Sequence, residues 1–213
     1  MAFLLRVELP DVPGSLGALA TALGSAEADI EAIEIVEHRP DGVAVDDVLL
    51  ELPSHVFPDA LITACHELEG VRVHWISRYN AGANLRLDLE AVESFAAEPD
   101  HAVERFVDAL PDTFRVDWAL ALHLDDGTPA TVHQTRNAPE LPAEASAWLA
   151  VDAPGRLDPV PGWDSTVLAG TQAKDRDGRS FVVVVGRHGG PSFLASELAR
   201  LGHMASLAAS VQI

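Results

Sequence analysis

The residues with the clearest chemical potential lie in one short turn, Asp11 to Leu16, between an alternating strand and a helix. Such a turn leaves the first N–H groups of the helix without partners inside it. Those donors, together with the positive end of the helix dipole, suit a carboxylate or a phosphate. Pro13 and Gly14 also shape a tight turn and Ser15 is a common helix cap, so part of the pattern is structural.

A second group of interest is the pair of adjacent carboxylates Asp46 and Asp47, which interrupts the apolar alternation of residues 43–52. In a strand, neighbouring side chains point to opposite faces. One of the two carboxylates could therefore face inward toward a site. A bulge or a sheet edge would instead keep both in water, and this is the structure that we expect.

Metal and nucleophile chemistry find little support in the residue pattern. The nine histidines include no pair at ligand spacing on an expected helix with a third ligand in view, so we expect no metal and no cofactor. Asp175, Asp177 and Gly178 lack the closing Glu of a calcium loop and are typical of a hairpin turn. Cys65 lies on an apolar helix face and is expected to be a packing residue. No nucleophile elbow is present in the sequence.

An enzyme would have to draw an acid–base pair from the second half of the chain. The candidates are His123, Asp125, Asp126 and His133. A deep pocket that gathers these groups would support catalysis. Exposed carboxylates at a hairpin tip would not.

The elements that position the turn follow the order strand, helix, strand, strand, helix, strand over residues 2–79. Apolar stripes predict helices over 16–25 and 58–68. Arg39-Pro40-Asp41-Gly42 is typical of a hairpin tip. We expect a four-stranded antiparallel sheet with both helices on one face. This βαββαβ order is the ferredoxin-like arrangement.

The pattern Asp11-x-Pro13-Gly14-x-Leu16 between a first strand and a first helix resembles the signature of ACT domains, small regulatory modules that bind amino acids. The resemblance implies a homodimer in which the ligand carboxylate meets the amides near Gly14–Leu16. It also implies a polar contact from the start of the partner's second strand, where this chain has Asp29 and Ile30. An Asp there could pair with a ligand ammonium group. The implied ligand-binding residues are Asp11, Val12, Pro13, Gly14, Ser15, Leu16, Asp29 and Ile30, with the carboxylate on the amides of Ser15 and Leu16.

Residues 80–100 read as a linker followed by a helix. Leu85, Leu89, Val92 and Ala96 recur at a and d spacing, which fits either a core-facing helix or a dimer seam. The remaining segment, 101–213, reads as helix, hairpin, irregular crossover, hairpin and long final helix. With Val182–Arg187 followed by Pro191-Ser192-Phe193, it resembles a GAF domain. The expected fold is therefore α+β, with an ACT-like domain over 1–79 and a GAF-like antiparallel sheet with flanking helices over 101–213.

Composition limits the partners of this chain. Its 213 residues carry 33 acidic against 14 basic side chains, a net charge of −19. That charge repels nucleic acid and anionic membrane, so we expect neither as a partner. A single cysteine fits a reducing compartment, and residues 1–6 contain no basic leader. We expect a cytoplasmic protein.

Together these features predict a non-catalytic regulatory protein that senses a small molecule, an amino acid in particular, as a homodimer. Two alternatives stay open. The chain could be a dimerising scaffold that binds another protein and no small ligand, or an enzyme with its active site in 101–213.

Overall fold

The chain is described from a computed structural model. The structure describes residues 1–78 and 83–212, so the first residues of the linker expected at the start of 80–100 lie outside the described residues. The chain divides into two compact units, Met1–Ala83 and Asn84–Ile213. Both units are α+β, and both sheets are antiparallel.

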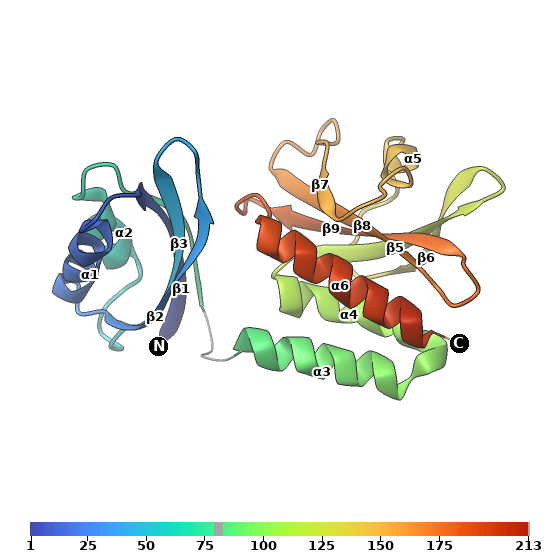
Figure 1. Cartoon of the computed structure of the whole chain (residues 1–213), viewed down its shortest axis with the longest axis horizontal. Coiled ribbons are helices and arrows are strands. Elements are labelled where there is room, and N and C mark those ends of the chain that lie inside the picture. Colours follow the sequence, from blue (N-terminus) through green and yellow to red (C-terminus); the bar gives the residue numbers. More distant parts are fainter. Residues whose placement is uncertain (79–82, 213) are drawn as a thin grey trace. The chain divides into compact units, whose positions relative to one another are not determined.

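The first unit is a four-stranded sheet with two helices on one of its faces (Figure 1). Its strands lie in the order β2-β3-β1-β4. Along the chain the elements are β1 (Ala2–Pro10), α1 (Ser15–Ser25), β2 (Asp29–His38), β3 (Val43–Glu51), α2 (Asp59–His66) and β4 (Arg72–Arg78). Both helices begin and end within two residues of the bounds expected from the sequence.

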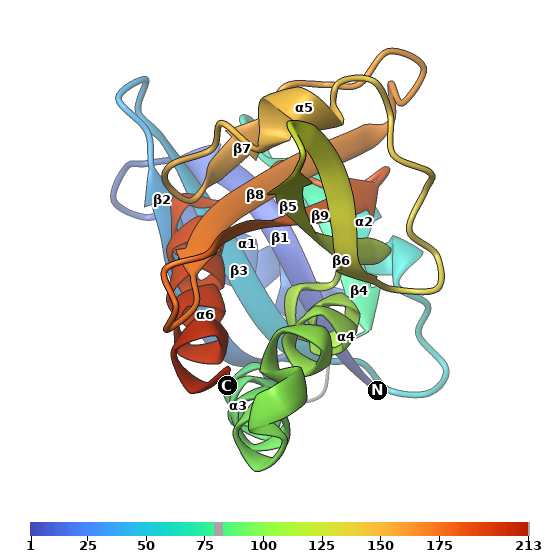
Figure 2. The same cartoon turned by 90° about the vertical axis from the view of Figure 1, so that its right-hand side faces the viewer.

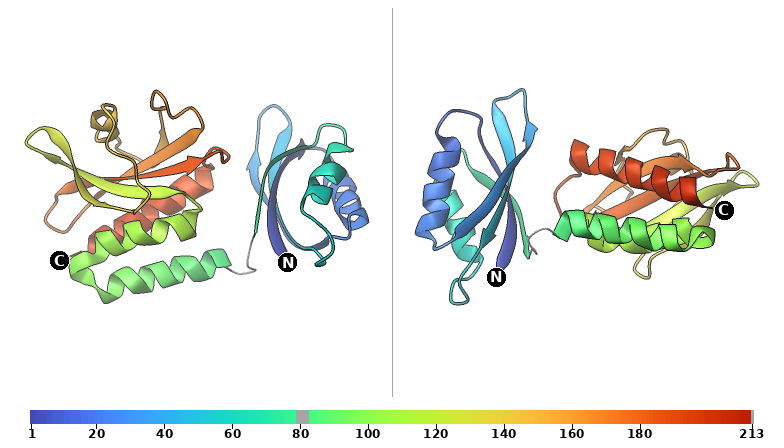
Figure 3. Two further views of the ribbon diagram at one scale, coloured as in Figure 1. Left: turned by 180° about the vertical axis from the view of Figure 1, so that it is seen from behind. Right: turned by 60° about the horizontal axis from the view of Figure 1, so that its bottom comes forward.

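The core of this unit lies between the sheet and the helices. Alternate residues of β1 point toward the helices and are buried, as the alternation predicts; these are Phe3, Leu5, Val7 and Leu9. The helices contribute Leu19, Leu23, Leu61 and Cys65 to the same cluster. Views from other sides show α1 and α2 on the same face (Figure 3).

The order of the strands decides what each helix covers. Because α1 connects β1 to β2 and β3 lies between these strands, α1 crosses over β3. By the same reasoning α2 connects β3 to β4 and crosses over β1. The residues of β3 that face the helices therefore lie beneath α1.

The second unit is a five-stranded sheet in the order β6-β5-β9-β8-β7. In Figure 2, the long helices lie on one side of this sheet and α5 on the other. The elements are α3 (Ala83–Ala97), η1 (Pro99–His101), α4 (Ala102–Phe114), β5 (Trp118–Asp125), β6 (Thr128–Gln134), α5 (Ala145–Trp148), β7 (Gly155–Leu157), β8 (Thr166–Lys174), β9 (Ser180–His188) and α6 (Ala195–Val211).

Strand β9 is buried on both faces, as its continuous apolar run predicts. Val183 and Val185 face the core under the long helices, whereas Val182 and Val184 face a second core. The second core is closed by residues of the segment 138–164, which contributes Trp148, Val160 and Trp163. The short strand β7 in this segment is not predicted by the sequence, because three residues show no periodicity.

Helix α3 belongs to the second unit. Its buried side chains are Ala91 and Phe95, and the ring of Phe95 meets that of Phe106 edge-on at 6.2 Å. Val92 packs partly against this core, whereas Leu89 is 54% exposed. The side chain of Leu85 lies outside the described part of the chain. The helix thus faces the core through Val92, as expected, but mainly through Ala91 and Phe95, which are offset from the expected a and d positions.

Arg187 ties three elements of this unit together. Its guanidinium donates to the carbonyl oxygens of Phe114 at 2.9 Å and Pro191 at 3.1 Å, and to Glu197 Oε1 at 2.8 Å. It also lies 4.3 Å from the centre of the Phe193 ring. This buried charge has its hydrogen bonds satisfied, as buried charges normally do.

Over residues 1–78 and 83–212, no helix combines the length and the apolar character needed to cross a bilayer.

Candidate functional site

The turn between β1 and α1 is held by its own backbone. The amide of Asp11 donates to the carbonyl of Gly42 at 2.8 Å, and the amide of Val12 donates to that of Pro10 at 2.9 Å. Gly14 precedes the helix with a φ of 101°, and no side chain caps the helix. The left-handed φ explains the glycine, since other residues adopt it only at a steric penalty.

The first amides of α1 are the chemically useful groups of this turn. The amide of Ser15 donates to the carbonyl of Val12 at 3.2 Å, so it is already engaged. Among the described residues, the amides of Leu16 and Gly17 have no acceptor within the turn or the helix. An anion at this end would therefore meet Leu16 and Gly17 instead of the expected Ser15 and Leu16.

The turn is open to solvent. Val12 is 59% exposed, and Asp11, Pro13, Gly14 and Gly17 are exposed as well. A Cβ atom placed on Gly14 would meet nothing within 4 Å. The backbone at Gly14 is consequently accessible from solvent.

His38, which the sequence analysis did not single out, joins the site. Its Nδ1 lies 2.8 Å from Asp11 Oδ2, although β2 and β1 are not neighbours in the sheet. The contact forms because β2 ends where the turn begins: His38 pairs with Ala44, and Pro10 pairs with Val43. Sequence spacing alone gives no sign of it.

The environment of Asp46 differs from the one expected from the sequence. We expected a bulge or an edge to keep Asp46 and Asp47 in water, but β3 is an inner strand and Asp46 is 1% exposed. Asp46 stands opposite Val7, so it faces the helices. Burial raises the pKa of the Asp46 carboxyl; the charge of His38 lowers that pKa, and those of Asp11 and Asp47 raise it further.

Asp47 points to the opposite face and is paired. Arg6 donates to its two carboxylate oxygens at 2.6 and 2.7 Å. Farther along the same face, Glu8 contacts Arg39 and lies 2.9 Å from His74. Burial acts to raise the pKa of Glu8, but hydrogen bonds from His74 and Arg39 outweigh it and the pKa is lowered. These pairs join β1 to its neighbours and leave the Asp11–Leu16 turn free.

Asp29 and Ile30 lie far from the turn within one chain. Asp29 pairs with Glu51, which pairs with Ala2, at the end of the sheet opposite to Pro10. The separation is the length of a nine-residue strand, roughly 30 Å at about 3.3 Å per residue. One chain therefore brings together Asp11, His38, Asp46 and the start of α1, but not Asp29.

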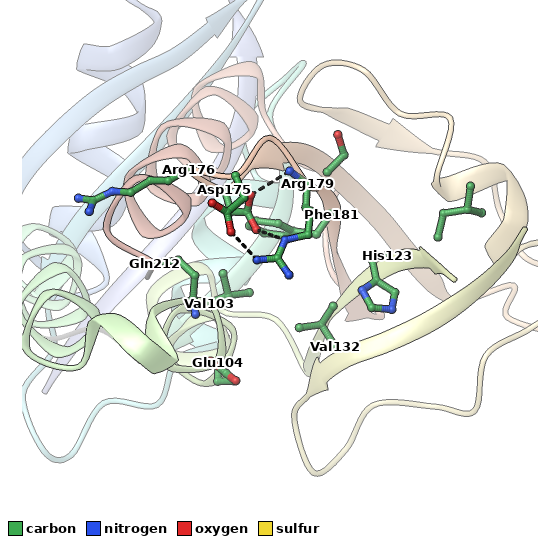
Figure 4. A pocket seen from close by; sticks show the side chains of 12 residues that line it. Val103, Glu104, His123, Val132, Asp175, Arg176, Arg179, Phe181 and Gln212 are labelled. Atoms are coloured by element: carbon green, nitrogen blue, oxygen red, sulfur yellow. Dashed lines mark hydrogen bonds and ion pairs between the residues drawn. The ribbon is translucent and has the colours of Figure 1, made fainter. Parts of the chain in front are cut away.

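The second unit contains a cavity of about 740 Å³ between its two long hairpins and the start of α4 (Figure 4). Val103, Val132 and Phe181 form its apolar walls. At its rim Arg179 is held by Asp175 and Asp177, at 3.2 and 2.7 Å.

The groups required for catalysis do not converge in this cavity. His123 lines it, but Asp125 and Asp126 are exposed at the hairpin tip. His133 pairs instead with Asp108 of α4 at 2.8 Å. The described residues also contain no group of three or more His, Cys, Asp or Glu side chains arranged to hold a metal ion.

Comparisons with known proteins give partial likenesses. No family model matches the chain. A 74-residue stretch is 34% identical to NAD-dependent malic enzyme 1 of Bacillus subtilis; it covers 34% of this chain and 17% of that enzyme.

Among solved structures, the GAF domain of an Acinetobacter phosphoenolpyruvate-protein phosphotransferase is similar with a TM-score of 0.48 and 13% identity, over 61% of this chain and 92% of that one. The corresponding domain from Coxiella burnetii has a TM-score of 0.47 and 15% identity, over 62% of this chain and 95% of that one. The GAF domain of a putative sensor histidine kinase from Pseudomonas syringae has a TM-score of 0.41 and 17% identity, over 62% of this chain and 86% of that one.

Proposed function

We propose that this protein is a non-catalytic, cytoplasmic regulatory protein that binds an amino acid at the Asp11–Leu16 turn and acts as a homodimer. One observation carries the proposal: the open amides of Leu16 and Gly17 stand at the start of α1 beside an exposed turn with free space at Gly14. A carboxylate there gains two hydrogen bonds and the favourable end of the helix dipole. The resemblance of this turn to ACT domains supports an amino acid as the ligand.

The edge strand β2 supports the dimer. No described strand pairs with its outer side, and Ile33 and Ile35 are 36% and 45% exposed. An open edge of ten residues is a template for pairing with another strand. A two-fold axis perpendicular to the sheet would pair two copies of β2 in antiparallel fashion and keep all helices on one face.

Such pairing would also complete the site. If two copies of β2 pair over their full length, Asp29 of the partner subunit stands opposite His38. Because His38 contacts Asp11, the partner's Asp29 and the partner's Ile30 would then lie beside the turn. This arrangement would bring together the site residues that a single chain keeps apart.

The second unit is proposed to be a GAF-like module that receives or passes on the signal. Its resemblance to GAF domains in the pattern of its elements supports a sensory role. The output would pass through another protein, which the chain itself does not identify.

The test is a thermal-shift screen of the full chain against the twenty amino acids and the common nucleotides. A ligand at 100 times its Kd should stabilise the protein by about 2.7 kcal/mol. Gly14→Val should abolish the shift, because it strains the turn and places a branched side chain beside the ligand. Gly127→Val is the matched control: it changes a glycine of φ 80° in a hairpin of the second unit and should leave ligand binding intact. No shift with any amino acid would refute the proposal.

A dimerising scaffold without a small ligand is the second candidate. The exposed edge and the two isoleucines of β2 favour it independently of the turn. A dimer that binds no amino acid or nucleotide in the same screen would favour this candidate.

A further inference from the structure

Asp46 differs from the other buried charged residues that the structure describes. Both of its carboxylate oxygens are inaccessible to solvent, and over residues 1–78 and 83–212 neither has a hydrogen-bond partner. By contrast, Arg187 donates to carbonyl oxygens and to Glu197, and Glu8 contacts Arg39 and His74. A buried carboxylate without partners is unfavourable, and such exceptions in otherwise satisfied proteins concentrate at functional positions.

The sheet places this carboxylate beneath the start of α1. Asp46 shares the helix-facing side of β3 with its cross-strand partner Val7, and α1 crosses over β3. Val43, three residues earlier, pairs with Pro10 at the end of the sheet where the chain turns into α1. The helix therefore begins at this end of the sheet, on the face to which Asp46 points. The charges of Asp11 and His38, which belong to the same turn and strand end, act on it.

The two halves of this site have complementary chemistry. The amides of Leu16 and Gly17 offer hydrogen-bond donors, and the Asp46 carboxylate offers only acceptors. An α-amino acid presents a carboxylate and an ammonium group on one carbon atom, and an ammonium group donates up to three hydrogen bonds. His38 already contacts Asp11 at 2.8 Å, whereas no described residue donates a hydrogen bond to Asp46.

We propose that Asp46 receives the ammonium group of the bound amino acid while the ligand carboxylate caps α1. This inference rests on the proposed function and deepens it, because it assigns the ammonium contact to β3 of the same chain instead of Asp29 of the partner subunit. Ile35 stands opposite Asp46 on the edge strand β2 and is 45% exposed. The proposal requires that this side chain move to admit the ligand to the carboxylate.

The experiment compares amino acids with their 2-hydroxy acid analogues, in which a hydroxyl group replaces the ammonium group. The twenty amino acids are screened first, and calorimetry then gives the Kd of each one that binds and of its analogue. Wild-type protein should bind the amino acid at least about tenfold more tightly than the analogue, because the hydroxyl group carries no charge for Asp46 to pair with.

Asp46→Asn conserves shape and removes the charge. It should weaken amino-acid binding about tenfold or more and abolish the preference over the 2-hydroxy acid. Asp41→Asn is the matched control, because it changes an exposed aspartate at a hairpin tip. Asp29→Asn is not a control but the test of the rival carboxylate. Both should keep the preference. Urea unfolding of each variant shows that the fold is retained.

The outcomes separate this inference from the function on which it rests. If wild-type protein binds an amino acid and Asp46→Asn binds it with the same preference, the inference is overturned and the proposed function stands. Loss of the preference in Asp29→Asn alone would assign the ammonium contact to that residue and also overturn the inference. If no amino acid binds to wild-type protein, the proposed function and the inference fail together.

Discussion

At the scale of single residues, Asp46 shows how an apparently ordinary side chain acquires an unusual environment. Its neighbour Asp47 has Arg6 as a partner on the face of the sheet away from the helices, whereas Asp46 points toward the helices. One residue of difference in position along a strand thus decides between a paired and an unpaired carboxylate.

We predict that Asp46→Asn stabilises the ligand-free protein at pH 7. Burial raises the pKa of Asp46 in the folded state, so its protonated form favours folding. The contribution is fully present below the pKa of the unfolded chain and is lost as the pH rises through the folded-state pKa. Removing the charge should therefore increase the free energy of unfolding at pH 7 by roughly 1–3 kcal/mol.

Urea unfolding at pH 7 and pH 4 measures this effect. The advantage of the variant should shrink at pH 4, where wild-type Asp46 takes up a proton. The charges of His38, Asp11 and Asp47 also act on the pKa of Asp46, so the comparison is made between wild type and variant at each pH. An advantage of equal size at both values would contradict the role of the charge.

Cys65 gives a second prediction at this scale. The thiol is fully buried on α2, and burial raises its pKa to about 11. A thiol reagent such as DTNB should react with it only after unfolding, because the thiolate is the reactive form. The rate of reaction in increasing urea should follow the unfolding transition. Rapid reaction of the native protein would show that α2 packs differently.

At the scale of elements, the packing of β9 against the second core depends on Gly186. A Cβ atom at this position would lie 2.2 Å from ring atoms of Trp118. The Trp118 ring in turn meets that of Trp163 at 5.8 Å, almost perpendicular to it. The tryptophans and β9 therefore fit together only because residue 186 has no side chain.

We predict that Gly186→Ala lowers the free energy of unfolding by about 1–3 kcal/mol, the usual effect of overpacking. Tryptophan fluorescence followed through urea unfolding measures the loss. Gly155→Ala is the control, since the nearest atom to its added Cβ lies at 3.7 Å, an ordinary contact. Equal stability of the two variants would mean that the Trp118 ring moves freely away from β9.

At the scale of the whole molecule, two features oppose each other in assembly. The net charge of −19 repels a second copy, whereas the edge strand β2 offers backbone groups with which another strand could pair. Salt screens the repulsion between exposed charges more strongly than it weakens apolar contact. Any association through β2 should therefore tighten as salt is added.

We predict a dimer by light scattering at tens of micromolar protein, and a shift toward monomer in Ile33→Lys, which places a charge beside the edge of β2. Leu124→Lys is the control, because Leu124 is exposed in a hairpin of the second unit. A monomeric mass for wild-type protein at this concentration and moderate salt would rule out a stable dimer. Equal effects of the two variants would place the interface elsewhere.

Local chemistry in the sequence was enough to determine the order of the elements. Alternation identified β1, the Asp-Gly pairs identified the three hairpin tips, and the apolar run 181–185 identified a strand buried on both faces. The start of α1 follows from Gly14 and Ser15 for the same reason: each of these signals involves residues close together in the chain.

Only the tertiary structure decided which distant residues meet. Asp46 is buried because β3 lies inside the sheet, although the sequence of β3 suits an edge strand. His38 reaches Asp11 because β2 ends beside the turn. The amide of Ser15 donates to the carbonyl of Val12, so the amides left open are those of Leu16 and Gly17. This hydrogen bond depends on backbone geometry that residue types do not encode. Strand neighbours are chosen by the packing of the whole unit, and so the chemistry of this site is a property of the fold.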